Sequence, residues 1–152
     1  MESSCITPYQ VVKTDKDYSF YTDAGVKYSA YFREYAMDFY YLYEFGFYRN
    51  QEGRFSLDRR IKETIKLILL DFWKNHDNII LFVCDSMDGR SLSRQRLFNR
   101  WYSEMGVPYG IVKYDFEVDI LRASVLSYKD NMWLRPTLVE LDRLFKLMQG
   151  QS

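Results

Sequence analysis

Apolar and polar residues alternate on both sides of a short turn early in the chain. Positions 18, 20 and 22 alternate with polar neighbours, and positions 28, 30 and 32 resume the alternation. Between them, Asp23-Ala24-Gly25 has the composition of a tight turn. Because a period of two places every second side chain on one face of a strand, residues 18–32 are predicted to form a β-hairpin.

A longer alternation over residues 35–48 is dominated by aromatic residues. Every odd position is apolar or aromatic, whereas the even positions are mixed. The pattern predicts a third strand that is long or that has a break near Asp38. Its aromatic face has two interpretations, a core layer beneath a helix or a stacking platform for nucleic-acid bases, and the core layer is favoured.

After a loop at residues 50–53, the spacing of apolar residues changes to that of a helix. Ser56 or Asp58 can cap a helix that ends near residues 75–76. An apolar run over residues 79–84 then predicts a central strand that is covered on both faces. The apolar stripe of the helix consists of Leu57, Ile61, Ile65, Ile68 and Phe72.

The last third of the chain predicts a helix, two strands and a final helix. The helix covers residues 91–105, and alternation over residues 109–128 predicts two strands with a turn somewhere in 117–121. Pro136 fits the first turn of the final helix. The stripe of that helix consists of Leu138, Leu141, Leu144, Phe145 and Met148.

The order of elements is therefore βββαβαββα. This mixture predicts an α+β fold, with a mostly antiparallel sheet of about six strands and three helices. Residues 1–16 lack periodicity and are predicted to be an irregular lead-in. Residues 17–150 are predicted to form a single domain, since a chain of 152 residues can bury one core.

Composition narrows the class of protein. The 21 Lys and Arg balance the 21 Asp and Glu, so the net charge gives no support for nucleic-acid binding, although a local basic face would permit it. A hydrophobic content of 47% excludes a disordered protein. No apolar stretch approaches about 18 residues, so no membrane span is expected. The chain starts with the polar and acidic residues Met1-Glu2-Ser3-Ser4, so no signal peptide is expected either.

The cysteines and the histidine point to a reducing compartment and to no metal site. Cys5 and Cys84 are the two cysteines and do not form a disulfide framework. His76 is the single histidine, whereas a structural zinc site needs four His or Cys ligands. We therefore predict a cytoplasmic protein with no metal and no cofactor.

The predicted second helix carries three arginines and follows a fourth, Arg90, directly; two of the four are expected to point inward. On a helical wheel Arg94 lies among the apolar residues, and Arg90 joins it if that residue is helical. Arg96 and Arg100 lie elsewhere on the wheel and are expected to be solvated. Because burying a guanidinium alone costs several kcal/mol, an inward arginine must be paired with a carboxylate or hydrogen-bonded. The candidate partners are Asp85, Asp88 and Glu44.

These arginines and acids support two interpretations. In the first, a buried Arg-carboxylate bridge only locks a loop to the helix. In the second, the residues line a small polar pocket at the carboxyl end of the central strand. The candidate pocket consists of Asp85, Ser86, Asp88, Arg90 and Arg94.

Catalytic patterns are weak. The order Asp23, Glu63, Asp85 partly resembles the carboxylates of ribonuclease H-like nucleases, which bind Mg²⁺. Asp23 falls in the predicted turn, however, and Glu63 lies opposite the apolar stripe of its helix. His76 lies at a helix end, and Ser86 has no evident histidine partner. An enzymatic function is therefore not favoured.

The segment after the central strand carries a specific motif. It reads CDSxDGR over residues 84–90 and RxRLFxxW over residues 94–101. It resembles a family of small proteins, mainly from Bacteroidota, that is known as a domain of unknown function. The likeness covers most of residues 18–148, but where the family often has Asn-Pro this chain has Asn131-Met132. The resemblance implies no activity.

Two classes of function remain. The favoured one is a small cytoplasmic protein-interaction module, and the resemblance associates it with a mobile-element, toxin-antitoxin or defence locus. Its partner would bind exposed aromatic residues near Tyr40, Leu42 and Tyr48. The alternative is a hydrolase or metal-dependent nuclease that uses the pocket around Asp85, Asp88, Arg90 and Arg94.

Overall fold

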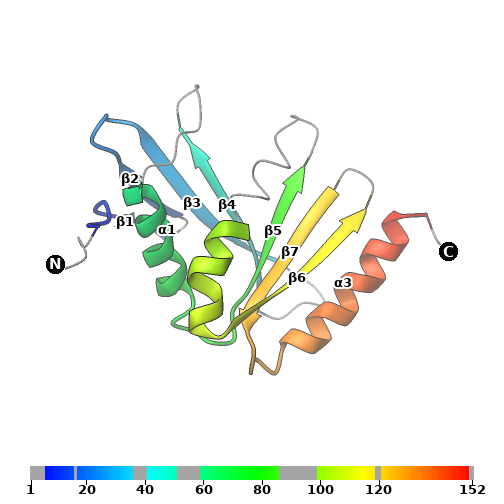
Figure 1. The fold of residues 1–152 in the computed structure, drawn as a ribbon. Helices are drawn as coiled ribbons and strands as arrows, with labels where there is room; N and C mark the ends of the chain where they lie inside the picture. Colours follow the sequence, from blue (N-terminus) through cyan, green and yellow to red (C-terminus); the bar gives the residue numbers. More distant parts are fainter. Residues whose placement is uncertain are drawn as a thin grey trace. The chain divides into compact units, whose positions relative to one another are not determined.

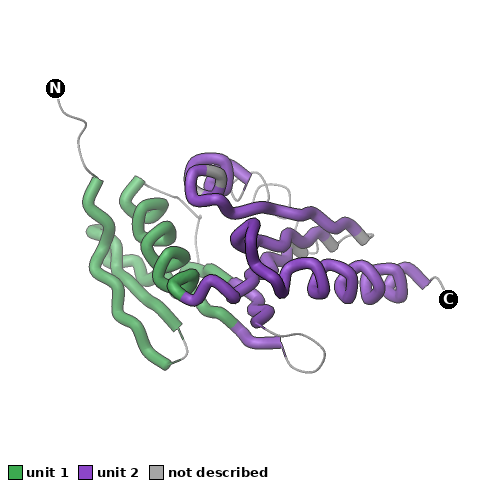
Figure 2. Tube along the Cα trace, turned by 90° about the horizontal axis from the view of Figure 1, so that it is seen from below, with its two compact units in different colours: residues 1–32, 46–74 green, residues 33–45, 75–152 purple. Residues whose placement is uncertain are grey.

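The fold is α+β, as predicted. The computed structural model describes residues 6–15, 17–35, 41–50, 59–85, 99–118 and 121–150. They contain a seven-stranded, mostly antiparallel sheet, one strand more than the six or so expected, together with α-helices (Figure 1). The strands are hydrogen-bonded in the order β1-β2-β3-β4-β5-β7-β6. The chain groups into two compact units, residues 1–32 with 46–74 and residues 33–45 with 75–152 (Figure 2).

The first unit contains the predicted hairpin. Strand β2 (Asp17–Tyr21) pairs antiparallel with β3 (Lys27–Glu34), and Gly25 takes a positive φ of 80° in the turn between them. The unit also contains β1 (Val12–Lys13), the end of β4 (Leu42–Arg49) and helix α1 (Arg59–Phe72). The predicted third strand is therefore shorter than its aromatic pattern, whose residues 36–40 lie outside the described part.

Helix α1 covers one face of the strands with the predicted stripe. Ile61, Ile65 and Ile68 are at most 2% exposed, and the ring of Phe72 stacks on Phe32 with centroids 3.9 Å apart. Leu57, the first residue of the stripe, lies outside the described residues. Beneath the helix, the rings of Phe20, Tyr28 and Phe47 stack on one another, which agrees with an aromatic core layer.

The stretch before β2 is more ordered than predicted. Tyr9 is 6% exposed, and its ring stacks on Phe20. The backbone N–H of Tyr9 donates to Thr64 Oγ1 on α1 at 2.8 Å, and Val12 pairs with Ser19 of β2. Two paired residues are too short to produce a periodic pattern, so the sequence could not show this strand.

The second unit is centred on β5 (Ile79–Asp85), as predicted. Strand β5 pairs in parallel with β4 and antiparallel with β7 (Leu121–Tyr128), which in turn pairs with β6 (Ile111–Val118). Strands β4 and β5 can be parallel because the chain between them includes α1, a connection long enough to return to the same end of the sheet.

Helical segments lie on both faces of β6 in this unit. Helix α3 (Leu134–Met148) packs Leu134 and Leu141 into a core with Ile79 and Val125. The predicted stripe was wrong at Met148, which is 58% exposed in the last turn. On the other face, a helical stretch over residues 99–101 continues as a π-helix (Tyr102–Gly106) and a 3₁₀ turn (Val107–Tyr109).

The described end of the second helix agrees with the helical wheel. Trp101 is buried and Arg100 is exposed.

Among the described helices, none combines the length and apolar character that crossing a membrane requires.

Candidate functional site

The predicted polar pocket falls almost entirely outside the described residues. Asp85 is the last residue of β5, and its backbone pairs with Leu121 of β7. Ser86, Asp88, Arg90 and Arg94 lie outside the described ranges. The pocket and its two interpretations therefore stay predictions.

The three residues of the predicted aromatic surface have different outcomes. Tyr40 lies outside the described residues, and Tyr48 is exposed at 44%. Leu42 was wrongly placed at a surface, because it is 0% exposed and belongs to the core beneath α3. The cause is the parallel pairing of Leu42 with Ile79 of β5, which makes β4 an internal strand at this point.

Tyr48 belongs to a larger surface in the first unit. Direct cross-strand partners share a face, and Tyr21 pairs with Lys27, Ser19 with Ser29. The neighbouring residues in these strands, Tyr18, Phe20, Tyr28 and Ala30, are buried on the side of α1. The residues between them, such as Tyr21 and Lys27, therefore lie on the face opposite α1. We call this surface the tyrosine face; it consists of Val12, Asp17, Ser19, Tyr21, Lys27, Ser29, Tyr31, Gly46, Tyr48 and Asn50.

A glycine shapes the centre of the tyrosine face. A Cβ atom on Gly46 would lie 2.1 Å from the ring of Tyr31, so the ring covers the strand where no side chain stands. The ring of Tyr48 lies 6.3 Å from that of Tyr31, centroid to centroid. Ser29 Oγ donates to Asn50 Oδ1 at 2.9 Å beside them. Glycine is therefore required for the packing of Tyr31.

The opposite face is fixed to α1 by one carboxylate. Tyr18 Oη donates to Asp71 Oδ2 at 2.7 Å, and Lys13 Nζ donates to the same oxygen at 2.9 Å. Lys74 Nζ lies 3.0 Å from Asp71 Oδ1. The hydrogen bonds from Tyr18, Lys13 and Lys74 hold the pKa of Asp71 well below its usual range. The charged carboxylate thus joins β1 and β2 to the end of α1.

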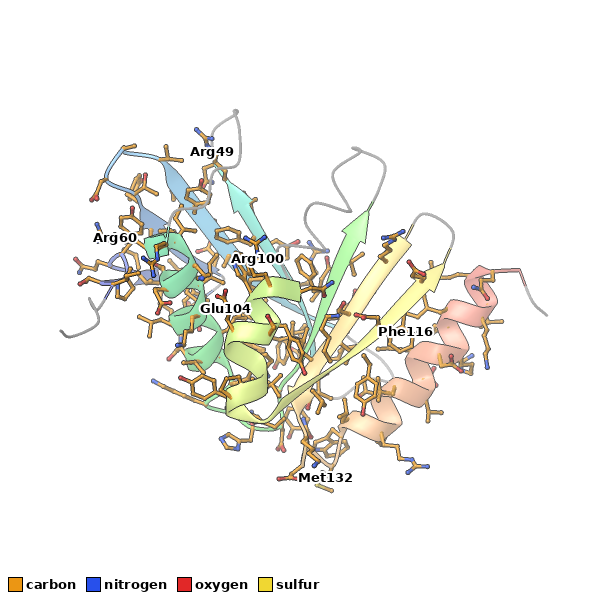
Figure 3. All side chains as sticks on the ribbon, viewed as in Figure 1. Arg49, Arg60, Arg100, Glu104, Phe116 and Met132 are labelled. Atoms are coloured by element: carbon orange, nitrogen blue, oxygen red, sulfur yellow. The ribbon has the colours of Figure 1, made fainter. Side chains whose placement is uncertain are left out.

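The first unit also has a small hollow beside the hairpin turn. Its volume is about 290 Å³, at the lower end of the size of ligand pockets. Asp23, an acid of the nuclease-like order, accepts a hydrogen bond from Arg60 Nη1 at 2.9 Å. Arg60 projects from the first turn of α1 and lies 3.9 Å over the ring of Tyr9 (Figure 3). The lining residues are Tyr9, Thr22, Asp23, Ala24, Val26, Tyr28, Arg49 and Ile61.

A polar cluster in the second unit joins β6 to β7. Lys113 Nζ donates to both oxygens of Asp115, and Ser124 Oγ donates to Asp115 Oδ1 at 2.6 Å. Burial alone would raise the pKa of Asp115, but the hydrogen bonds from Lys113 and Ser124 outweigh it and lower that pKa. Across the described ranges, no three His, Cys, Asp or Glu side chains are grouped so that they would hold a metal ion.

Comparison with known proteins identifies a family. The model of a family of unknown function, DUF6169, matches residues 57–136, more than half of the chain. The chain belongs to the DUF6169 family. The match runs from just before α1 to the first turn of α3, and it includes the predicted polar pocket. No curated protein and no solved structure matches the chain. The strands of the tyrosine face precede the DUF6169 match, so family membership carries no information about that face.

The sequence contains a signal for the tyrosine face in the positions between the apolar ones. Once positions 18, 20, 28 and 30 are assigned to the core, the remaining positions of the hairpin must form the other face. Those positions include Tyr21 and Tyr31, and large aromatic residues on a solvated face are unusual enough to indicate a binding surface.

Proposed function

We propose that this protein is an interaction module that binds a protein partner on the tyrosine face. The observation that carries the proposal is the exposure of tyrosines on a sheet face that no described helix of the first unit covers. Tyr21 is 59% exposed and Tyr48 is 44% exposed, although both stand on strands that contribute to the core. Burying such rings against a partner removes apolar area from water, and each hydroxyl keeps a hydrogen-bonding group at the contact.

The composition of the tyrosine face supports a protein partner. Its three tyrosines are accompanied by Ser19, a glycine and an asparagine, whereas Ser29 is 2% exposed and donates to Asn50. Tyrosine offers a large, rigid contact area at little cost in side-chain entropy, and Ser, Gly and Asn provide adaptable hydrogen bonds. The same residue types dominate the surfaces with which antibodies bind proteins.

The charges on the tyrosine face argue against single-stranded nucleic acid. Surfaces that stack bases on aromatic rings also need a positive groove along the backbone. Within the first unit, Lys27 is the one basic residue of the tyrosine face, and Asp17 opposes its charge. Farther along the same side of β3 and β4, Arg33 and Glu44 add one charge of each sign. The net charge of the whole chain is zero. A neutral aromatic surface therefore supports a protein partner better than a polyanion.

The cellular setting is part of the same proposal. We place the protein in a bacterial cytoplasm, because two cysteines among 152 residues are typical of a reducing compartment. The association with a mobile-element, toxin-antitoxin or defence locus rests on the family resemblance alone. A hydrolase or nuclease at Asp85, Asp88, Arg90 and Arg94 stays the alternative.

The test compares capture by matched variants of the full chain. The wild type, Tyr21→Ser/Tyr48→Ser and the control Tyr109→Ser are immobilised and incubated with nuclease-treated native lysate. Tyr109 is 44% exposed, like Tyr48, but lies in the second unit. We expect the wild type and Tyr109→Ser to retain a set of proteins that the double variant does not retain. All three chains should have the same thermal unfolding temperature.

Two results would contradict the proposal. One is a set of captured proteins that does not differ between the double variant and the control. The other is binding of a fluorescent oligothymidine by the wild type that the double variant loses, because the tyrosine face would then bind nucleic acid.

A further inference from the structure

Strand β6 lies at an edge of the sheet. It pairs with β7 along all eight of its residues, and the strand order ends with it (Figure 1). On its other side no strand of the described ranges is hydrogen-bonded to it. A long edge strand is a template for pairing with another chain. The question is therefore which chain fits this edge.

One hydrogen bond shows which backbone groups of β6 point outward. Lys129 N donates to Gly110 O at 3.0 Å, and these residues extend the register in which Ile111 faces Tyr128. Hydrogen-bonded and non-hydrogen-bonded pairs alternate along antiparallel strands. Residues 112, 114 and 116 therefore direct their N–H and C=O groups to β7, and residues 111, 113, 115 and 117 direct theirs to the outer edge.

A side chain confirms this alternation at the first residue. Tyr102 Oη donates to Ile111 O at 2.9 Å, so that carbonyl does point away from β7. The outer edge that remains for another chain is centred on Lys113 and Asp115. These two residues carry opposite charges on the same face of the strand, where Lys113 Nζ donates to Asp115.

We propose that β6 pairs with β6 of a second copy of this chain, antiparallel and with Tyr114 on the two-fold axis. In this register Lys113 of each copy faces Asp115 of the other, and Tyr114 faces Tyr114. Val112 of each copy faces Phe116 of the other on the face that α3 covers. Opposite charges and aromatic pairs stabilise neighbouring strands when they face each other directly.

The neighbouring registers are unfavourable. A symmetric antiparallel pair can also be centred on Lys113 or on Asp115 with the same backbone groups in contact. Centring on Lys113 places two lysines opposite each other, and centring on Asp115 places two aspartates opposite each other. Like charges in direct opposition destabilise a strand pair. Of these three registers, the charges of β6 therefore favour the one centred on Tyr114.

The exposure of Tyr114 and of Asp115 agrees with this register. Tyr114 is 44% exposed on the side of the strand that carries Phe116, whose ring stacks on Phe145 of α3 (Figure 3). The Asp115 side chain is 51% exposed, which leaves room for a second lysine, whereas that of Lys113 is 10% exposed. Two copies would form a closed group of four charges, an isologous contact with two-fold symmetry.

The test measures the oligomeric state of the full chain. Sedimentation equilibrium from about 1 μM to about 1 mM spans weak and moderate affinities. We expect the mass of the wild type to rise toward that of a dimer. Tyr114→Lys places two positive charges on the axis and should weaken dimerisation about tenfold or more. Asp115→Asn removes both charge pairs and should weaken it less, with a smaller dependence on salt.

The control keeps this inference separate from the proposed function. Tyr48→Lys changes a tyrosine of equal exposure on the tyrosine face and should dimerise like the wild type. A monomeric wild type over the whole range overturns the inference. So does a dimer that Tyr114→Lys and Asp115→Asn do not weaken while their thermal unfolding stays that of a folded protein. Neither result bears on capture by the tyrosine face.

Discussion

Asp71 provides the sharpest test of how the first unit is held together. Its carboxylate accepts hydrogen bonds from Tyr18 on β2 and from Lys13 on β1, and it forms an ion pair with Lys74 after α1. Asp71→Asn keeps the shape of the side chain and removes its charge. The variant therefore measures the contribution of one charged group that joins a helix to two strands.

The expected magnitude follows from the exposure of each partner. A hydrogen bond to a charged group contributes about 1.5–3 kcal/mol, whereas an exposed ion pair contributes at most about 1 kcal/mol. The side chains of Lys13 and Lys74 are 62% and 80% exposed, whereas Tyr18 is 8% exposed, so most of the effect comes from the hydroxyl of Tyr18. We expect Asp71→Asn to lower the free energy of unfolding by about 1.5–3 kcal/mol at pH 7.

The contribution of Asp71 to stability should depend on pH in a definite direction. The pKa of Asp71 is lower in the folded chain than in the unfolded chain, where it is near the ordinary value of about 4. Its contribution is present above that unfolded value and is lost as the pH falls through the folded pKa. The difference in stability between wild type and Asp71→Asn should therefore shrink on acidification below about pH 4.

Urea titrations between neutral and acidic pH, followed by tryptophan fluorescence, measure this difference. Trp73 is 1% exposed and lies close to Asp71 in the sequence, so its emission reports on the site. As a control, Asp142→Asn removes a 54% exposed partner of Lys146 on α3 and should cost about 0.5 kcal/mol or less. Equal effects of the two variants at pH 7, or a difference that does not change with pH, would refute the argument.

Three further substitutions test the packing by urea denaturation. Thr64→Val removes the acceptor of the buried Tyr9 N–H and should cost about 1–3 kcal/mol, whereas Thr64→Ser, which keeps the hydroxyl, should cost less. Gly46→Ala should cost about 1 kcal/mol because its Cβ displaces the Tyr31 ring, and the cost should vanish in a Tyr31→Ser background. Leu141→Ala should cost about 2–5 kcal/mol, since this 5% exposed side chain fills the core beneath α3. An effect near zero for Thr64→Val or Leu141→Ala, or an unchanged cost of Gly46→Ala without Tyr31, would contradict the packing described above.

The parts of the candidate site that depend on local pattern could be predicted, and the others could not. Burial of Ile61, Ile65 and Ile68 follows from the helical period. Alternation does not separate Leu42 from Tyr48, because both stand on the same face of β4 and yet are 0% and 44% exposed. Burial of Leu42 could not be predicted, because both faces of its strand carry apolar residues. Its environment is set by β5, a strand more than thirty residues away.

The amino-acid sequence was sufficient to assign the type and approximate extent of the longer described elements, because the spacing of apolar residues reports on each segment's own geometry. It determined the hairpin β2–β3, the stripe of α1 and the pair β6–β7, whose partners are close in the chain. The parallel pairing of β4 with β5 and the position of β6 at the edge are known only from the folded chain. Strand neighbours depend on hydrogen bonds between distant segments, and the alternation within one strand does not specify its partner.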